Sequence, residues 1–321
     1  MANEYKPAAQ PTMYFIGVTT GKSSIMKVFP AWAEELGLSA VIKGFDFPQH
    51  DKPEHYREVV EFIKYDPNSL GALVTTHKLD LFKAARDLFD CADPYAEILD
   101  EVSSISKRGA ALWGHAKDPI TAGLSLEAIV DDGYWRRTRG ELLLLGAGGS
   151  SLALTLYLHN KLLDGGDVPY KIVVTNRSEP RLNEMKAVHQ KIGIKIPVEY
   201  HLAPTPDKND AVTKTLPPAS MVVNATGLGK DAPGSPLTDA VEFPDNGIAW
   251  EFNYRGDLVF LDQANTQKER KNLKIEDGWV YFIHGWTRVI AEVFHLDIPT
   301  CGPEFDRLSD IAGDIARGGT K

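Results

Sequence analysis

The chain has 321 residues, of which 43% are hydrophobic and 25% are charged, an ordinary composition for a globular protein with a full hydrophobic core. Its length suggests two domains or one large domain. The formal net charge of −9 argues against nonspecific binding to nucleic acid, which needs a basic surface, but allows a local positive pocket for an anionic small molecule.

The cysteines and histidines indicate neither a disulfide framework nor a metal site. Cys91 and Cys301 lie far apart, no CxxC occurs, and the nine histidines show no HExxH or similar spacing. The N-terminal segment lacks the basic and apolar regions of a signal peptide, and no apolar run approaches the roughly 20 residues of a membrane span. We therefore expect a cytoplasmic protein with no membrane partner.

The first part of the chain alternates predicted strands and helices. Apolar, β-rich runs predict strands at 13–20, 39–47 and 70–76. Amphipathic or capped segments predict helices that start after Ser23 or Ser24 and that cover 55–66, 78–89 and 94–99. Pro30 predicts a kink or a restart in the first helix. This order indicates βαβ units and a mostly parallel sheet.

A hairpin and a helix are predicted to end this part. Residues 101–118 have the pattern of a short hairpin that turns at Arg108-Gly109, and a helix is expected over 120–131. A domain boundary is expected near this helix. The strand and helix order then starts again, with strands predicted at 140–149, 170–177, 198–204, 220–229 and 247–254. Helices are predicted at 150–163, 179–192, 259–268 and 281–296.

A glycine-rich motif directly follows the four leucines of the 140–149 strand and opens a helix. The motif is Gly146, Ala147, Gly148, Gly149, Ser150 and Ser151. This is the context of a dinucleotide fingerprint, in which the glycines allow a tight turn and the helix N-terminus favours a pyrophosphate. Ser151 stands where the third glycine is usual. The alternative is a glycine-rich turn that binds nothing.

The next predicted strand ends in a segment rich in arginine. It contains Asn176, Arg177, Ser178, Glu179 and Arg181. An NAD enzyme usually has an acidic residue here, whereas guanidinium groups pair with a phosphate through two hydrogen bonds. Arg177 and Arg181 therefore predict a clamp for the 2′-phosphate of NADP. Two exposed arginines without a ligand would be the alternative, but cations at a helix start oppose its dipole.

Together with a third motif, these segments resemble the shikimate/quinate dehydrogenase family. The third motif is Asn224, Ala225, Thr226 and Gly227, which continues to Gly229. The resemblance extends from about Phe15 to Leu296, and it is stronger in the cofactor half than in the substrate half. It implies that Ala225, Thr226 and Gly227 form the loop under the nicotinamide, and that the cofactor is NADP.

The resemblance also implies a catalytic pair. Lys78, after Val74-Thr75-Thr76-His77, stands at the family's lysine position, and Asp118 stands at the aspartate of its G-x-N-T-D motif. A hydroxyl carbon loses hydride only if the hydroxyl proton also leaves, so a general base is required. A lysine in a partly desolvated cleft can act as that base because burial lowers its pKa.

The residues that would bind substrate depart from the family pattern. The resemblance assigns this role to Lys22, Ser23, Ser24, Thr75, Thr76, Ser103, Tyr254 and His284. The second serine of the family's N-terminal motif falls on Ile25, its asparagine becomes Ser103, and its C-terminal glutamine becomes Gly285. His284 is either a replacement for that glutamine or an ordinary helix histidine, and Tyr254 either lines the cleft or belongs to the core.

The expected fold is therefore α/β with two domains. Residues 1–121 would form the N-terminal α/β substrate-binding domain, 122–275 a Rossmann-type NADP-binding domain, and 276–321 helices that return to the first domain. The expected activity is reversible oxidation of a ring secondary alcohol, shikimate or a close analogue, by a monomer or homodimer. The alternatives are a paralogue for another cyclic polyol or hydroxy acid, a non-catalytic NADP sensor, and a folate-type dehydrogenase of the same plan.

Overall fold

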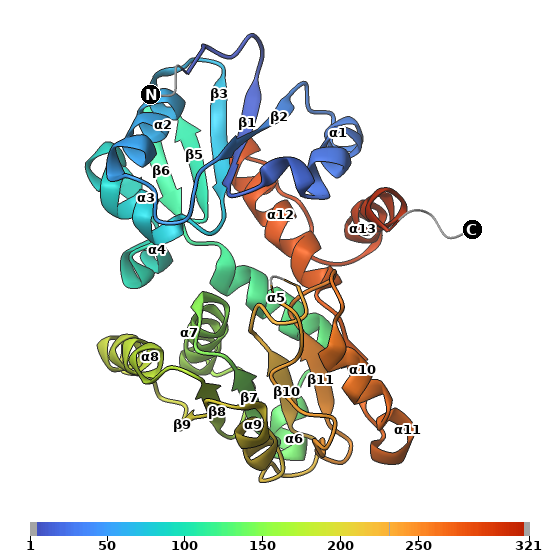
Figure 1. Ribbon diagram of the computed structural model, residues 1–321. Helices are drawn as coiled ribbons and strands as arrows, with labels where there is room; N and C mark the ends of the chain where they lie inside the picture. Colours follow the sequence, from blue (N-terminus) through green and yellow to red (C-terminus); the bar gives the residue numbers. More distant parts are fainter. Residues whose placement is uncertain (1–4, 231, 318–321) are drawn as a thin grey trace. The chain divides into compact units, whose positions relative to one another are not determined.

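A computed structural model describes residues 5–230 and 232–317, and the chain divides into two compact units (Figure 1). The first unit contains the residues up to Lys117 together with those from Ile283 onward, and the second contains Asp118–Phe282. The boundaries expected from the sequence are 121 and 275. Each unit contains helices and one six-stranded sheet, which confirms the predicted α/β class.

The sheet of the first unit is mixed. Its strands are β1 (Thr12–Gly17), β2 (Val41–Asp46), β3 (Ser69–Val74), β4 (Cys91–Ala92), β5 (Ser104–Arg108) and β6 (Ala111–His115). They lie in the order β2-β1-β3-β5-β6-β4. The pairs of β1 with β2 and with β3 are parallel, as the βαβ pattern predicts, whereas β5 and β6 form the antiparallel hairpin expected around Arg108-Gly109.

The helices of the first unit pack on this sheet and on one another. They are α1 (Ile25–Glu35), α2 (Pro53–Tyr65), α3 (Lys78–Ala85), α4 (Pro94–Leu99), α13 (Pro303–Ala316) and the part of α12 (Trp279–Phe294) from Ile283 onward. α1 continues through Pro30 without a restart, because Val28, Phe29 and Trp32 are buried on both sides of the proline. The indole of Trp32 donates a hydrogen bond to the carbonyl oxygen of Leu308 at 2.8 Å, which fixes α13 on α1.

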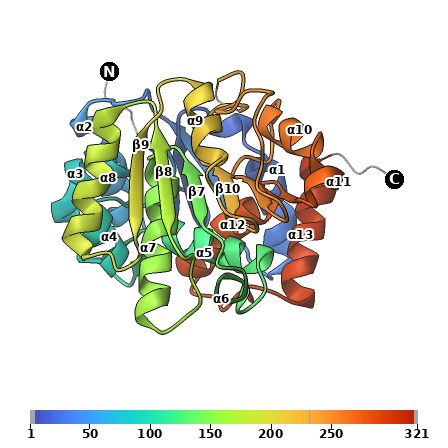
Figure 2. The ribbon, with the colours of Figure 1, turned by 90° about the horizontal axis from the view of Figure 1, so that it is seen from below.

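The sheet of the second unit is entirely parallel. Its strands are β7 (Leu142–Leu145), β8 (Ile172–Asn176), β9 (Val198–Leu202), β10 (Met221–Asn224), β11 (Ile248–Glu251) and β12 (Lys274–Glu276). Their order is β9-β8-β7-β10-β11-β12, and Figure 2 shows β9, β8, β7 and β10 side by side. This is the strand order of a Rossmann fold, with β7 as its first strand.

Both faces of this sheet are covered by helices. These are α5 (Asp118–Ile129), α6 (Tyr134–Thr138), α7 (Gly149–Leu163), α8 (Glu179–Ile192), α9 (Pro206–Thr213), α10 (Val259–Asn265) and α11 (Lys268–Lys271). Side chains of β7 alternate between two cores, with Leu142 and Leu144 in one and Leu143 and Leu145 in the other. All four are fully buried, which explains why a parallel strand reads as an unbroken apolar run.

Candidate functional site

The turn after β7 lies where the strand order reverses. From β7 the chain leads to β8 on one side, whereas β10 lies on the other side, and ligands of open α/β sheets bind at the carboxyl ends of strands at such a point. Gly148 precedes α7 as its N-cap, and a Cβ added at Gly148 or Gly149 would meet no atom within 4 Å. The helix start is therefore open toward solvent, as a pyrophosphate site requires.

Gly146 serves a different purpose from these two glycines. Its φ is +108°, a conformation that side chains rarely adopt, and a Cβ would lie 3.1 Å from the carbonyl oxygen of Ala225 and 3.2 Å from Cγ2 of Thr226. The turn after β7 is thus in contact with the loop after β10. Ser151, which replaces the third glycine of the motif, donates its hydroxyl proton to the carbonyl oxygen of Gly146 at 2.6 Å and is fully buried.

Asn176 connects the glycine turn to the arginine segment. Its Oδ1 accepts a hydrogen bond from the backbone N–H of Ala147 at 3.3 Å, and its Nδ2 donates to the carbonyl oxygen of Ser178 at 3.0 Å. Arg177 is exposed and forms no ion pair with the residues that the structure describes. Arg181, in the first turn of α8, pairs with Glu184 at 2.7 Å on the surface. A guanidinium beside the open turn is therefore available to a phosphate.

The loop after β10 is held by its own hydrogen bonds. Oδ1 of Asn224 accepts from the backbone N–H and the hydroxyl of Thr226, and Oγ1 of Thr226 accepts from the N–H of Leu228 at 3.2 Å. Gly227 is exposed. The three predicted loop residues Ala225, Thr226 and Gly227 thus lie against the fingerprint turn, at the reversal point of the sheet.

A buried carboxyl group is hydrogen-bonded to Asn224 at the start of this loop. Glu251 is fully buried at the end of β11 and accepts hydrogen bonds from Asn224 and Asn253. Burial raises the pKa of Glu251 to about 7, although these hydrogen bonds and the charge of Lys230 act in the opposite direction. A polar residue at the end of a predicted strand is the sequence signal for such a group. No sequence pattern predicts that Asn224 and Glu251, which lie 27 residues apart, are in contact.

In the first unit, Lys78 follows a strained turn. Thr76 has a φ of +59°, which is unusual for a β-branched residue, and Lys78 is the half-buried first residue of α3. Between them, His77 is buried, and its Nδ1 lies 2.9 Å from the hydroxyl of Tyr56. Such strain costs about 1–3 kcal/mol and is concentrated at functional sites. Thr75 is half-buried beside this turn.

The hydroxyl of Ser103 is hydrogen-bonded to backbone groups. Its Oγ accepts from the N–H of Lys117 at 2.8 Å and lies 3.5 Å from the carbonyl oxygen of His115. Ser103 is 3% exposed, so this position holds the segment that leads to Asp118. Asp118 itself is the first residue of α5, where a carboxylate suits the helix dipole.

An ionic cluster that sequence reasoning missed lies beside this segment. Glu292 of α12 pairs with Lys117 at 2.7 Å, with Arg108 at 3.1 Å and with His115 at 3.3 Å. Burial would raise the pKa of Glu292, but the hydrogen bond from Lys117 and the neighbouring positive charges lower it overall. The cluster anchors α12 to the end of β6.

The predicted carboxylate-binding residues lie on neighbouring turns of the first unit. Lys22 is exposed at the end of the short 3-10 helix Thr20–Lys22, and Ser23 and Ser24 follow it as half-buried residues before α1. The backbone N–H and the hydroxyl of Thr20 donate to Oδ1 of Asp46 at 2.7 and 2.6 Å. This turn therefore has a fixed position at the end of β2.

Two other predicted substrate residues are involved in aromatic packing. His284 is 1% exposed and stacks on Phe305 with 4.5 Å between ring centroids, and burial lowers its pKa to about 4. These observations favour its interpretation as an ordinary helix histidine. Tyr254 is half-buried and packs with Trp279 and Phe282 of the second unit.

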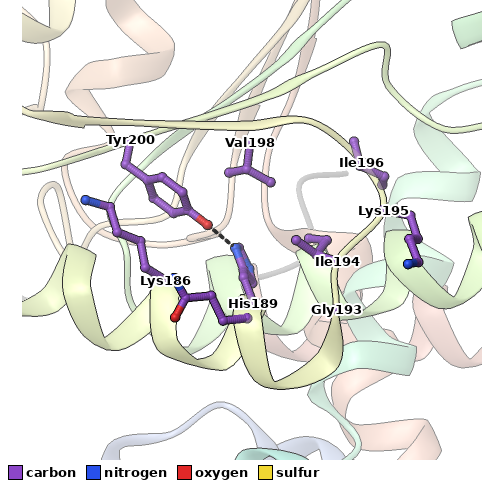
Figure 3. A pocket seen from close by; sticks show the side chains of 9 residues that line it. Lys186, His189, Gly193, Ile194, Lys195, Ile196, Val198 and Tyr200 are labelled. Carbon is purple, nitrogen blue, oxygen red and sulfur yellow. Dashed lines mark hydrogen bonds between the residues drawn. The ribbon is translucent and has the colours of Figure 1, made fainter.

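A surface depression lies at the opposite end of the second sheet. It has a volume of about 500 Å³ and is lined by the end of α8, the 193–196 loop and the start of β9. Figure 3 shows the hydroxyl of Tyr200 directed at His189, to which it is hydrogen-bonded. His189 is also bonded to Thr155 at 2.8 Å, so its ring is satisfied as part of the core.

Residues 5–230 and 232–317 contain no cluster of three or more histidine, cysteine, aspartate or glutamate side chains that could hold a metal ion. None of the helices described in these ranges is long and apolar enough to cross a membrane.

Known proteins offer two kinds of comparison. No family profile matches the chain. The NADP(+) shikimate dehydrogenase of Lactococcus lactis is 27% identical over 179 residues, which cover 56% of this chain and 59% of that protein. The corresponding protein of Thermus thermophilus is 27% identical over 247 residues, 76% of this chain and 78% of its own length. The chain thus covers less than two thirds of the length of the first of these relatives.

The fold extends the likeness to the whole chain. The shikimate dehydrogenase of Aquifex aeolicus has a TM-score of 0.71 at 20% identity and covers 98% of this chain and 100% of its own. That of Thermus thermophilus, in complex with NADP(H) and shikimate, has a TM-score of 0.65 at 22% identity, with coverages of 95% and 99%. Quinate dehydrogenase of Corynebacterium glutamicum, in complex with NAD, reaches 0.69 at 16% identity, with coverages of 94% and 98%. In sequence this chain is thus similar to NADP(+) shikimate dehydrogenases, and it shares the fold of solved shikimate and quinate dehydrogenases.

Proposed function

We propose that the chain is an NADP-dependent oxidoreductase that oxidises, reversibly, a secondary alcohol on the ring of a small hydroxy acid such as shikimate. One observation carries the proposal: the open glycine turn after β7 lies at the reversal point of a Rossmann sheet and is bonded to Asn176, next to Arg177. The names of the relatives and the bound ligands of the solved neighbours support it.

The cofactor would occupy three segments of the second unit. The pyrophosphate would lie on the backbone N–H groups of Gly148, Gly149 and Ser150, where no side chain obstructs the helix start. The 2′-phosphate would lie against Arg177, with Asn176, Ser178 and Arg181 beside it. The nicotinamide would lie on the 225–227 loop. Bound NADP supplies the acceptor for the hydride.

Lys78 and Asp118 would carry the proton chemistry. Nζ of Lys78 would take the proton of the substrate hydroxyl as the hydride leaves the carbon that bears this hydroxyl. In the reverse reaction, Lys78 would return the proton to the oxygen. The carboxylate of Asp118 orients the lysine and the hydroxyl. The strained turn at Thr76 supports a functional role for the segment that carries Lys78.

The substrate would be recognised by polar groups of the first unit. Lys22, with Ser23 and Ser24, supplies a charge and hydroxyl groups for a carboxylate. Thr75 and Thr76 add hydroxyl groups beside Lys78. Tyr254 of the second unit would contribute through its exposed part.

A second candidate function is oxidation of a different cyclic polyol or hydroxy acid. It is favoured by Ser103, whose hydroxyl is bonded to the backbone, and by His284, which is buried against Phe305. A site that hydrogen-bonds a substrate hydroxyl discriminates strongly, so losing such groups changes which ring is accepted.

The test is a panel assay of reduced cofactor by absorbance. Shikimate, quinate, an aminoshikimate and several cyclitols are each incubated with NADP and, in parallel, with NAD. Faster reduction of NADP with shikimate supports the first candidate, and activity confined to another ring supports the second. Binding of NADP without oxidation of any alcohol in the panel contradicts both and supports a non-catalytic sensor.

A further inference from the structure

Among the described residues, Glu251 accepts three hydrogen bonds, and all three donors are neutral groups. One oxygen accepts from the backbone N–H of Asn253 at 2.9 Å and from its Nδ2 at 2.6 Å, and the other accepts from Nδ2 of Asn224. Glu251 and Asn224 are both fully buried. A buried carboxylate whose hydrogen bonds all come from neutral groups is costly.

The network dictates how the amide of Asn224 is oriented. Because Nδ2 points to Glu251, Oδ1 is turned toward Thr226 and accepts from its N–H at 3.0 Å and from its hydroxyl at 2.6 Å. Nδ2 of Asn253 also lies 3.3 Å from the carbonyl oxygen of Thr226. Both ends of the loop's first turn therefore depend on the two amides that Glu251 holds.

The loop in turn forms one wall of the glycine turn. The N–H of Ala225 donates to the carbonyl oxygen of Leu145 at 3.0 Å, and a Cβ at Gly146 would lie only 3.1 Å from Ala225 and 3.2 Å from Thr226. A change in the loop is therefore transmitted to the backbone on which the cofactor would lie.

We propose that Glu251 is a positioning residue that makes cofactor affinity depend on pH: its ionised form holds the 225–229 loop in the binding conformation, and its protonated form releases it. The inference rests on the proposed binding of NADP. A proton on either oxygen removes the negative charge that strengthens these hydrogen bonds and occupies one acceptor lone pair. Glu251 then holds the amides of Asn224 and Asn253 less firmly, and the orientation of the Asn224 oxygen that accepts from Thr226 is weakened with it.

The environment places this change near neutral pH. Burial is the largest cause that raises the pKa of Glu251, to about 7. Lys230, in the loop, is the charged group that opposes it, whereas Asn224 on β10 and Asn253 after β11 are neutral. The ionised fraction rises from about a tenth at about pH 6 to about nine tenths at about pH 8, so affinity should rise about tenfold.

The test measures the dissociation constant of NADP by titration calorimetry at about pH 6, 7 and 8 for the wild-type chain and for Glu251→Gln. The 2′-phosphate of NADP also titrates near pH 6, but equally with both proteins, so their difference reports Glu251. The glutamine variant should bind at least about tenfold more weakly than the wild type at the highest pH, and the difference should shrink as the pH falls. Glu276→Gln on β12 is the control, because Glu276 is a partly exposed carboxylate that pairs with Lys274 at 3.4 Å.

Identical pH profiles of wild type and Glu251→Gln would overturn the inference. If the variant does not fold, NAD titrated into the wild type decides, because NAD lacks the 2′-phosphate: constant affinity between about pH 6 and 8 overturns the inference, and an approximately tenfold rise supports it. A wild-type chain that binds neither nucleotide at any pH overturns the proposed function, and this inference with it.

Discussion

The side chain of Asn176 bonds to the backbone N–H of Ala147 across the carboxyl ends of β7 and β8, with 3.3 Å between Oδ1 and N. The bond joins the turn that would bind a pyrophosphate to the segment that would bind a 2′-phosphate. The spacing of the two phosphate positions is therefore set by neighbouring strands of a rigid parallel sheet, whose register pairs Leu145 with Thr175.

Arg177→Asp should weaken NADP binding about 10- to 100-fold, because a charge-assisted hydrogen bond to a phosphate contributes about 1.5–3 kcal/mol. NAD lacks this phosphate, so its affinity should change little. Titration of both nucleotides into both proteins checks the prediction. Equal losses for NAD and NADP would remove Arg177 from the clamp.

Gly148→Ala and Gly146→Ala should differ in kind. A methyl group at Gly148 meets no protein atom but projects into the pyrophosphate position, so the melting temperature should stay unchanged while NADP binding weakens at least about tenfold. At Gly146, the φ of +108° and the contact with Ala225 should cost about 1–3 kcal/mol of folding free energy as well. Thermal melts with and without NADP separate the two, and unchanged binding by Gly148→Ala would argue against a pyrophosphate at this turn.

Lys78→Ala should lower kcat about 100- to 10 000-fold, the usual contribution of a general base, and leave the dissociation constant of NADP unchanged. Lys83→Ala on the same helix is a suitable control, because Lys83 is exposed on α3. Turnover by Lys78→Ala near the wild-type rate would exclude this lysine from the mechanism.

His284→Phe should reduce the sensitivity of folding stability to acid. The folded chain keeps His284 neutral down to about pH 4, whereas the unfolded chain binds a proton below about pH 6.5. Stability is therefore complete above that upper value and falls by about 1.4 kcal/mol per pH unit below it. Phenylalanine retains the stack on Phe305 and removes Nδ1, which is buried without a hydrogen-bond partner.

Urea denaturation between about pH 4 and 7 measures this effect. The comparison is His50→Gln, since the side chain of His50 is 88% exposed. If the stability of His284→Phe falls with decreasing pH as steeply as that of the wild type, another group causes the acid sensitivity. The KM for the alcohol should not change in His284→Phe if the residue belongs to the packing of α12.

Glu292→Ala should destabilise the chain by about 1–3 kcal/mol, because Lys117 and His115 would lose a partner whose side chain is only 16% exposed. Glu97→Ala is the matched control: Glu97 pairs with Arg86 at the surface, where such a pair contributes less than about 1 kcal/mol. Denaturation midpoints compare the two variants. A similar small loss in both would mean that the cluster is not an anchor of α12.

Sequence patterns predicted the elements that have a strong period. The leucines at 142–145, the alternating helices and strands of both halves and the hairpin at Arg108-Gly109 all occur as expected. Strands β4 and β12 were not predicted, because two or three residues show no period. Helices were expected in 276–321, but the bounds of α13 were not predicted, since its buried face consists only of Phe305, Leu308 and Ala312 in a polar segment.

The site was predictable where its residues form local motifs and not where they are joined only by folding. The glycine turn and the Asn176-Arg177 segment each follow a strand, and the sheet places them together. By contrast, Glu251 and Asn224 are 27 positions apart, and Glu292 and Lys117 are 175 apart. The local sequence around each residue does not indicate which distant residue it contacts. The burial and the contacts of these pairs are therefore known only from the structure.

The most direct test of the proposed activity uses shikimate labelled with deuterium at the carbon whose hydroxyl would be oxidised. After incubation with the chain and NADP, mass spectrometry determines whether the deuterium has moved to the reduced cofactor. We predict transfer of the label to NADPH by the wild-type chain and not by Lys78→Ala. Absence of transfer from shikimate, and likewise from correspondingly labelled members of the ring-alcohol panel, would contradict the proposed oxidoreductase.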